Sequence, residues 1–385
     1  MNPIYASLSD TIFDGMSALA RETGAVNLGQ GFPEWDGPED IRRRAADAVM
    51  RGPNQYPPMR GLPHLREAVA EHYARLQGVA LDWKTEITIT SGATEALAAA
   101  LLAVLSPGDE VILFEPMYDS YLPMLRRAGA TARFVRLYPP DWRVDPAALA
   151  AAFTLKTRAV VLNTPLNPSA SLIGAEDLAL IAAQCIKHNC IVISDEVWEH
   201  CVFDGMRHTP MLSIPGMRDR TIKIGSAGKI FSMTGWKVGF ACAAPALTEV
   251  FAKAHQFITF TTPPMLQEAV AFGLAKPAAH FDEMRQNLAR ARDRLATALH
   301  HEGFVTLPAA GTYFLGVDLA ASGIPLIDTD FAVRAVKECG VATIPFSAFY
   351  NRAPERALVR LCFAKSDATL DRGVEGLAKA RRLLA

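Results

Sequence analysis

The sequence predicts an α/β protein with a mostly parallel sheet covered by helices on both faces, followed by a smaller α+β layer. From residue 86 to residue 194, short β-branched runs alternate with helix-like stretches, as is typical of parallel strands joined by crossover helices. A long Arg-rich helical stretch from about residue 281 to residue 301 then leads into a region of mixed strands and helices. At 385 residues, the chain is long enough for two or more domains around a substantial core.

The composition favours a protein that binds neither nucleic acid nor a membrane. With 39 basic and 40 acidic residues, the chain is almost neutral. The amino-terminal stretch MNPIYASLSDTIF lacks the features of a signal peptide, and the most apolar segment, residues 96–105, is too short to span a bilayer. Six cysteines without a CxxC pair are expected to be buried free thiols of a cytoplasmic protein. Nine histidines without an HExxH motif predict no metal site.

Residues 1–40 are expected to form an arm. It contains the segment Gly29-Gln30-Gly31-Phe32-Pro33, whose two glycines would let the backbone approach a ligand closely, although a plain turn fits the pattern equally well. After a helix-like stretch, the loop at residues 54–58 carries Tyr56. Taken alone, this tyrosine would be ordinary packing.

The alternating region supplies the strands of the predicted sheet. We expect strands at residues 87–90, 111–114, 133–137, 159–163 and 191–194, and helices at residues 94–105, 120–128 and 176–188. In such sheets, ligands bind at the carboxyl ends of the strands. Ser91-Gly92-Ala93-Thr94 lies at such an end, directly before a helix, and can therefore seat an anion, although many helices simply begin with a small polar residue.

Asp195 follows the last of these strands, within the segment SDEVW at residues 194–198. A carboxylate among apolar residues either has a cationic partner or costs several kcal/mol. A protonated pyridine nitrogen would serve as that partner. A structural cap or an ordinary ion pair explains Asp195 equally well on this segment alone.

Residues 221–241 are the most informative stretch of the chain. Two apolar runs flank a glycine-bounded loop that contains Lys229. An amine near apolar walls has its pKa lowered towards neutrality, which makes Lys229 a candidate nucleophile, whereas an isolated lysine is more commonly a surface residue. Ser226 and Lys237 add a hydroxyl and a second cation, which a phosphate ester needs beside an amine that forms a Schiff base with an aldehyde.

The carboxyl-terminal region predicts the smaller α+β layer. Its expected elements are a strand at 312–317, a helix at 331–338, a strand at 359–363 and a final helix from residue 367. Alternation within the second strand puts Arg360 on the face opposite Val359 and Leu361. An arginine suits the forked recognition of a carboxylate, although a plain ion pair is the commoner role of a single arginine.

Together these motifs resemble the class I/II aminotransferases, which are fold-type I enzymes of pyridoxal phosphate (PLP). The chain is most similar to the branch that contains kynurenine aminotransferase, glutamine transaminase K and bacterial methionine aminotransferases. The resemblance covers the whole chain and rests on these segments: NLGQGFP (27–33), NQY (54–56), EPMYDSY (115–121), LNTPLNP (162–168), SDEVW (194–198), SAGKIFSMTGWKVG (226–239), IPFSAFY (344–350) and RLCFAK (360–365). It implies a mostly parallel seven-stranded sheet in a large PLP-binding domain at residues 41–280, a small α+β domain at residues 281–385, and an arm at residues 1–40 that joins the small domain.

The resemblance also implies roles for single residues. Lys229 would form the Schiff base and act as the base that moves the α-proton, and Asp195 would pair with the ring nitrogen of PLP. Asn167 would bind the ring hydroxyl, and Tyr118 would stack on the ring. The phosphate would be held by residues of both subunits of a homodimer, namely Ala93, Thr94, Ser226 and Lys237 with Tyr56 of the other subunit. The substrate α-carboxylate would be bound by Arg360, Asn167 and the backbone of Gly31.

Trp198 departs from the family pattern, in which a tyrosine hydroxyl usually bonds the ring oxygen beside Asn167. Indole can donate one hydrogen bond but cannot accept one. We therefore expect an active enzyme with an altered pKa of its Schiff base, which a titration of the cofactor absorbance would test. Lys237 also stands where many relatives have an arginine.

For the substrate side chain, the resemblance points to an aromatic lining without a second arginine, made by Phe13, Phe260, Phe346 and Trp35. Such a pocket should reject a second carboxylate, because that charge would lose its hydration without gaining a partner. The expected reaction moves an amino group between methionine, phenylalanine, kynurenine or glutamine and a 2-oxo acid, with ping-pong kinetics.

Other activities compete with this interpretation. An N-succinyldiaminopimelate aminotransferase or a carbon–sulfur β-lyase would use the same lysine and ring. The ligand-sensing module of a transcription regulator would follow a DNA-binding domain, whereas here the arm begins at residue 1. A nicotinamide-binding enzyme would need GxGxxG after the first strand, and the sequence lacks it.

Overall fold

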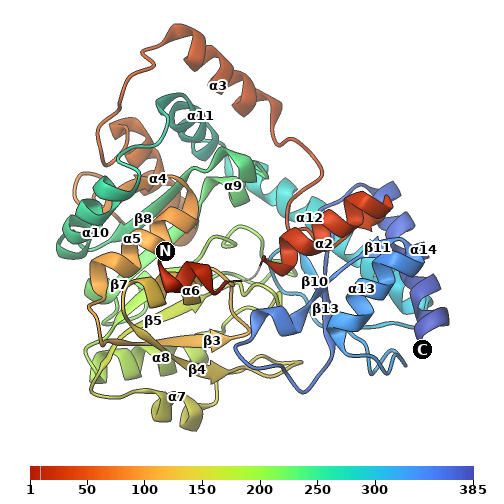
Figure 1. Ribbon diagram of the computed structural model, residues 1–385. Helices are drawn as coiled ribbons and strands as arrows, with labels where there is room; N and C mark the ends of the chain where they lie inside the picture. The colour runs from red at the N-terminus through yellow and green to blue at the C-terminus, as the bar shows by residue number, and fades with distance from the viewer. Residues whose placement is uncertain (9) are drawn as a thin grey trace.

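The computed structural model describes residues 1–8 and 10–385, which build two groups of layers around separate β-sheets (Figure 1). The larger sheet has seven strands in the order β2-β8-β7-β6-β5-β3-β4. Their bounds are β2 Ile87–Thr90, β3 Glu110–Glu115, β4 Thr131–Arg136, β5 Thr157–Asn163, β6 Ile191–Asp195, β7 Thr221–Ser226 and β8 Gly239–Ala243. All neighbouring pairs from β7 to β4 are parallel, and β8 runs antiparallel to both of its neighbours. The predicted mostly parallel, seven-stranded sheet is therefore confirmed.

The central strands are apolar on both faces because helices cover the sheet on both sides. In β5 and β6, consecutive β-branched residues such as Val160, Val161, Val192 and Ile193 are all buried. Helix α5 (Gly92–Val104) contacts β6, β7 and β8 on one face, while α7 (Pro146–Ala152) and α8 (Ala175–Lys187) pack into the cluster on the other. This is the continuous apolar pattern of parallel strands buried between helical layers.

Further helices surround these layers. Their bounds are α3 Glu39–Arg51, α4 Pro63–Gln77, α6 Tyr121–Arg127, α9 Ala227–Ile230, α10 Pro245–Ile258 and α11 Pro264–Leu274. Helix α10 packs along α5, and α11 packs along α3 and α4. Figure 1 shows α3 and α11 at one end of the molecule, above the large sheet.

The long helix α12 (Ala278–His301) leads to the smaller sheet, which is antiparallel with the order β12-β13-β10-β9. Its strands are β9 Val305–Thr306, β10 Phe314–Asp318, β12 Ile344–Pro345 and β13 Leu358–Cys362. Helices α13 (Asp328–Cys339) and α14 (Asp367–Leu384) pack against each other, and Figure 1 shows them beside α12, away from the large sheet. The α+β layer predicted for this region is present.

The amino-terminal segment contacts both groups of layers. Its first helix, α1 (Pro3–Ala6), contacts α6, whereas α2 (Ile12–Thr23) and β1 (Val26–Asn27) lie on the smaller sheet's side of the molecule, where β1 pairs in parallel with β11 (Val341–Ala342). Met16 and Ala20 of α2 pack in one cluster with Ala332 and Val336 of α13. The segment after β1 then crosses towards α3, and Gly31 is brought to the face of β10 and β13.

All six cysteines are buried free thiols, as the sequence predicted. Among the described residues, no helix combines the length and the apolar character that crossing a membrane requires.

Candidate active site

A cavity of about 470 Å³ opens at the carboxyl ends of β5, β6 and β7, next to the start of α5. Its volume lies within the range of roughly 300–1,000 Å³ that small-molecule sites usually have. Most of the residues singled out in the sequence line it, namely Phe13, Gly31, Ala93, Thr94, Tyr118, Asn167, Asp195, Trp198, Ser226, Lys229, Lys237 and Arg360. The fold therefore gathers segments from most of the length of the chain into one site.

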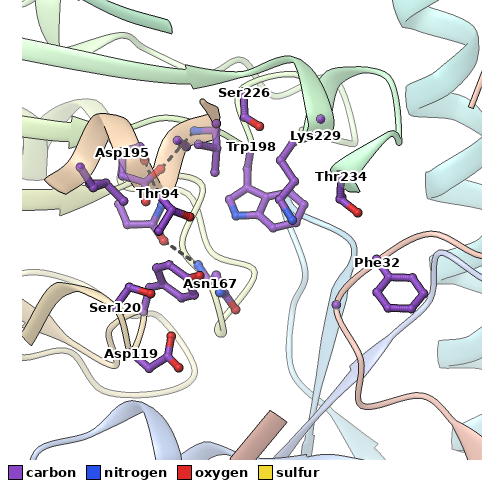
Figure 2. A pocket seen from close by; sticks show the side chains of 18 of the residues that line it. Phe32, Thr94, Asp119, Ser120, Asn167, Asp195, Trp198, Ser226, Lys229 and Thr234 are labelled. Carbon is purple, nitrogen blue, oxygen red and sulfur yellow. Dashed lines mark hydrogen bonds between the residues drawn. The ribbon is translucent and has the colours of Figure 1, made fainter. Parts of the chain in front are cut away.

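Lys229 presents a primary amine to this cavity from the short helix α9, directly after β7. Its Nζ donates a hydrogen bond of 3.0 Å to the hydroxyl of Tyr313 and lies 4.5 Å from the ring centroid of Trp198. Burial lowers the pKa of the Lys229 ammonium to about 8, because the charged form loses hydration. Figure 2 shows the Lys229 and Trp198 side chains next to each other, with Asp195, Thr94 and Asn167 beyond them.

Asp195 is a buried carboxylate that has hydrogen-bond donors but no cation bonded to it among the described residues. It ends β6, and its Oδ2 accepts a hydrogen bond of 2.5 Å from the hydroxyl of Tyr121. Its Oδ1 accepts a longer bond of 3.4 Å from the backbone N–H of Val197. Burial raises the pKa of Asp195 to about 6, even though these bonds and the Lys229 ammonium oppose the shift. A cationic ligand group beside this carboxylate would remove the cost of burying its charge.

The start of α5 is an anion seat. The Ser91 side chain does not cap the helix, because its Oγ is instead within 3.1 Å of the Thr259 hydroxyl and 3.2 Å of the Thr262 hydroxyl. The first-turn N–H groups of α5 therefore remain free to bind an anion, and the helix dipole favours a negative charge there. Gly92 has a φ of +79°, and a Cβ added there would lie 3.0 Å from the Cε of Lys237, so only glycine lets this lysine approach the helix start.

Ser226 and Lys237 complete this seat. Ser226 ends β7, and Lys237 precedes β8 in the left-handed conformation, with φ 53° and ψ 45°. Both line the cavity with Ala93 and Thr94, so one ammonium and two hydroxyls border the start of the helix. Thr234, which the sequence analysis did not single out, also lines this side.

Arg360 is a third basic residue of the cavity, and it is almost completely buried, with 2% of its surface exposed. Its Nη1 donates a hydrogen bond of 2.6 Å to Oδ1 of Asn167, and its Nη2 donates one of 3.1 Å to the carbonyl of Gly29. Its buried Nε has no hydrogen-bond partner within the part of the chain that the structure describes. Burial lowers the pKa of Arg360 to about 10. Its guanidinium lies 5.3 Å from the ring of Phe13, and a Cβ on Gly31 would come within 3.5 Å of its Nη2. This arrangement fits a carboxylate placed between Arg360 and the arm.

The aromatic lining expected for the substrate side chain is different in the structure. Of its four proposed members, Phe13 lines the cavity, whereas Phe346 is fully buried and packs on Trp142. Trp35 lines a separate cavity beside α12. The expectation that Phe346 and Trp35 form this pocket is therefore wrong for the chain, because packing directs both side chains elsewhere.

Tyr56 and Phe260 lie outside the cavity of their own chain. Tyr56 is 81% exposed and Phe260 is 41% exposed, and their rings contact each other edge to face at 5.4 Å. The two residues thus form an exposed aromatic pair on the surface.

Tyr121, Tyr313 and Asp119 are further polar residues at the site that were not predicted. Tyr121 binds Asp195, and Tyr313 binds Lys229. Asp119 lines the cavity as a carboxylate whose pKa is raised by burial, and no side chain of the described residues donates a hydrogen bond to it. The segment EPMYDSY could have indicated Asp119 and Tyr121, because they follow the expected ring-stacking residue Tyr118 by one and three positions, directly before and at the start of α6. No local pattern marks Tyr313.

A buried ion network lies directly behind Asp195. The ammonium of Lys223 contacts the carboxylates of Glu196, at 2.6 Å, and of Glu199, and all three side chains are inaccessible to solvent. His208 is 2.7 Å from Glu196, and the hydroxyl of Tyr73 donates to Glu199 at 2.8 Å. Glu196, Glu199 and His208 are close enough together to share a metal ion, but the Lys223 ammonium already contacts both carboxylates. The network anchors the turn that follows β6.

An anion seat, a buried carboxylate without a cation and a reactive amine thus face one cavity. These three features fit the phosphate, the ring nitrogen and the aldehyde of PLP, and with the mostly parallel seven-stranded sheet they define a PLP-dependent transferase. Residues 23–377 match the family model "Aminotransferase class I and II". The chain belongs to this family of PLP-dependent aminotransferases.

Known proteins of this family resemble the chain along nearly its whole length. It is 43% identical over 379 residues to a probable N-succinyldiaminopimelate aminotransferase of Mycobacterium tuberculosis, covering 96% of this chain and 95% of that one. It is also 43% identical over 377 residues to the methionine aminotransferase of Escherichia coli, covering 98% of this chain and 96% of that one. A crystal structure of an E. coli protein with a methionine aminotransferase function matches with a TM-score of 0.94 at 42% identity, covering 97% of both chains.

Proposed function

We propose that this aminotransferase moves an amino group between L-amino acids with uncharged side chains and 2-oxo acids, in two half-reactions with ping-pong kinetics. The observation that carries the proposal is that two groups line the same cavity: the free amine of Lys229 and the buried carboxylate of Asp195, to which no cation of the described residues is bonded. When bound, PLP supplies a protonated ring that withdraws electrons from the substrate α-carbon. The residues of the chain bind and orient the reactants and move the proton.

The coenzyme would be held by residues on three sides of the cavity. Asp195 would bind the ring N–H and keep that nitrogen protonated, because the cation restores the partner that the buried carboxylate lacks. Asn167 would bind the ring hydroxyl and Tyr118 would pack on the ring face, with the indole of Trp198 nearby. The phosphate would be bound at the anion seat by Ala93, Thr94, Ser226 and Lys237.

Lys229 would hold the aldehyde of PLP as a Schiff base, and its amine, when free, would carry the substrate α-proton. The lowered pKa of its ammonium, about 8, supports both tasks, since an appreciable share of the side chain is then neutral near pH 7. The substrate α-carboxylate would bind Arg360, with Asn167 and the backbone of Gly31 beside it. Phe13, whose ring lies over Arg360, would shield that ion pair from water.

The proposed preference for uncharged side chains rests on the charges of the cavity. Its cations among the described residues are Lys229, Lys237 and Arg360, and each has a role assigned above. Asp119 adds a carboxylate to which no cation of residues 1–8 and 10–385 is bonded. A second carboxylate on the substrate would therefore meet a like charge without gaining a partner, whereas an amide or aromatic amine could donate to Asp119. Methionine, phenylalanine, kynurenine and glutamine remain the proposed donors.

A homodimer with shared active sites is part of the proposal. The exposed pair of Tyr56 and Phe260 would reach the other subunit's cavity, Tyr56 towards the phosphate and Phe260 towards the substrate side chain. We further propose a division into an arm at residues 1–40, a large PLP-binding domain at 41–280 and a small domain at 281–385. A cytoplasmic location is proposed because all six cysteines are buried free thiols, the state expected in a reducing compartment.

An N-succinyldiaminopimelate aminotransferase is the second candidate, because a relative with that name is 43% identical over almost the whole chain. Asp119 argues against it, since the succinylated substrate carries additional carboxylates.

The test is a panel of amino donors against one 2-oxo acid, run with PLP-loaded protein, with Lys229→Ala and Lys229→Arg as comparisons. We expect turnover of methionine or glutamine well above that of aspartate and of the succinylated donor. Borohydride reduction should attach the coenzyme to Lys229 in a form that mass spectrometry detects. Faster turnover of the succinylated donor would establish the second candidate, and full activity of Lys229→Ala would refute the mechanism.

A further inference from the structure

Tyr313 connects the reactive amine to the arm. It directly precedes β10, and only 1% of its surface is exposed. Its hydroxyl accepts a hydrogen bond of 3.0 Å from Nζ of Lys229 and donates one of 2.7 Å to the carbonyl of Gly31. Its ring meets that of Trp198 edge to face, with centroids 4.4 Å apart. The hydroxyl is thus fixed between two groups that come from different parts of the chain.

The single hydrogen of the Tyr313 hydroxyl decides which of its two hydrogen bonds it donates and which it accepts. A tyrosine hydroxyl has one hydrogen and two lone pairs, and the carbonyl of Gly31 can only accept, so the hydrogen of Tyr313 points to Gly31. Burial raises the pKa of Tyr313 well above 10, so the hydroxyl stays neutral. Tyr313 therefore offers only a lone pair to Lys229. An ammonium donates more strongly to a lone pair than a neutral amine does, so this contact favours the protonated form of Lys229.

We propose that Tyr313 is a positioning residue that holds the amine of Lys229 by accepting its hydrogen, sets the protonation of that amine, and ties it to the Gly31 segment of the arm. The proposal rests on the reacting role proposed above for Lys229. Gly31 is also the arm residue beside Arg360, where the substrate carboxylate is expected. If the Gly31 segment shifts when substrate binds, the Tyr313 hydroxyl would move with it and change its contact with the amine of Lys229.

The other groups around the amine do not replace this contact. Among the described residues, Tyr313 is the one hydrogen-bond partner of Nζ. The ring face of Trp198 also attracts the ammonium, through its π electrons, but it offers no lone pair. The charged or titratable groups that act on the amine over a longer range are Asp195, Cys201, Arg360 and Cys362. The two thiols stay neutral because burial raises their pKa values, that of Cys201 to about 12. Asp195 stabilises the ammonium, and Arg360 disfavours it.

The test measures the protonation of Lys229 in coenzyme-free, full-length protein. A small amine-reactive reagent is supplied at a series of pH values, and the modified Lys229 peptide is quantified by mass spectrometry. The wild-type midpoint is expected near the Lys229 pKa of about 8. In Tyr313→Phe, the midpoint should fall by about one pH unit, the size expected for losing one charge-assisted hydrogen bond, with roughly fivefold faster labelling at pH 7.

Two further variants complete the experiment. Tyr313→Met, whose flexible side chain fills the space without a strong acceptor, should move the midpoint in the same direction and serves if the phenylalanine variant does not fold. Tyr350→Phe removes the hydroxyl of a tyrosine outside the cavity and should leave the midpoint unchanged. A midpoint that is unchanged or higher in the folded Tyr313 variants would overturn the proposal. The experiment measures no transamination, so an unchanged midpoint would not argue against the proposed function. Conversely, if the wild-type protein showed no transamination, the labelling experiment would still test the role of Tyr313.

Discussion

Replacing Asp195 with asparagine should stabilise the coenzyme-free protein against unfolding while it impairs catalysis. Asp195 is 4% exposed, and burial raises its pKa from 3.8 to about 6. A carboxyl group whose pKa is higher in the folded state binds its proton more tightly there, so the folded state loses stability as the pH rises from below 4 to above 6. Asparagine keeps an oxygen that can accept the Tyr121 hydrogen, but it carries no charge to desolvate.

The magnitude follows from the size of this shift. One pKa unit corresponds to about 1.4 kcal/mol, so ionising Asp195 lowers the free energy of unfolding by about 3 kcal/mol at pH 8 and by about half of that at pH 5. The variant should therefore gain stability at pH 8 and gain less at pH 5. With saturating PLP the order should reverse, because the wild-type carboxylate then has its cation and binds the coenzyme more tightly.

Urea denaturation of the two coenzyme-free proteins at both pH values, followed by fluorescence, measures these differences. Asp141→Asn is a suitable control, since Asp141 is exposed and its replacement should change stability by less than about 0.5 kcal/mol. A coenzyme-free Asp195→Asn protein that is less stable than wild type at pH 8, or a gain that is larger at pH 5, would show that burial does not set the energy of this carboxylate.

The remaining predictions concern four other positions. Lys223→Met leaves two buried glutamates without their cation and should lower the free energy of unfolding by about 3–5 kcal/mol in urea at pH 7; a loss below about 1 kcal/mol would contradict it. Asp119→Asn should raise kcat/KM for glutamate relative to glutamine by about tenfold, because a like charge is removed, and an unchanged ratio would count against the proposed selectivity. Arg360→Lys, which loses the two-pronged hydrogen bonding of the guanidinium to a carboxylate, should lower kcat/KM by roughly ten- to a hundredfold for all donors. Trp198→Tyr restores a hydroxyl that can donate to the ring oxygen, and the pH midpoint of the holoenzyme's absorbance should fall by about one unit.

The sequence was informative where the site is built from contiguous segments. Asp195 directly follows one of the strands expected from the alternation, which located it at the carboxyl edge of the sheet. Ser226 and Lys229 were indicated by the glycine-bounded loop after the apolar run that begins at Thr221, and in the structure Ser226 ends β7 and Lys229 follows in α9. Ala93 and Thr94 were indicated for the same reason as Asp195, since they begin the helix that follows β2. These positions depend on local structure and on the rule that parallel strands end at a common edge.

Side-chain direction in the loops could not be predicted in the same way. Phe346 packs in the core against Trp142, although it lies in the family-like segment IPFSAFY. Trp35 lines the separate cavity beside α12. The contacts of Tyr313 are set by tertiary structure alone, because its hydroxyl joins residues that are 84 and 282 positions away in the sequence. Such contacts leave no periodic pattern, so only the folded chain reveals them.

The cost of burying the Asp195 carboxylate explains why the carboxylates of Glu196 and Glu199 behind it are paired with Lys223. Desolvation lowers the pKa of Lys229 and raises that of Asp195. In the coenzyme-free cavity, the cost of burying the Asp195 carboxylate is therefore only partly compensated. Directly behind Asp195, Lys223 bonds two glutamates and keeps the pKa of Glu196 well below its usual value, despite complete burial. Removing that cation would add unpaired charge beside Asp195, whereas binding PLP supplies the cation that Asp195 lacks. The same low polarity that activates Lys229 therefore makes coenzyme binding stabilise the fold, provided that the neighbouring carboxylates are already paired.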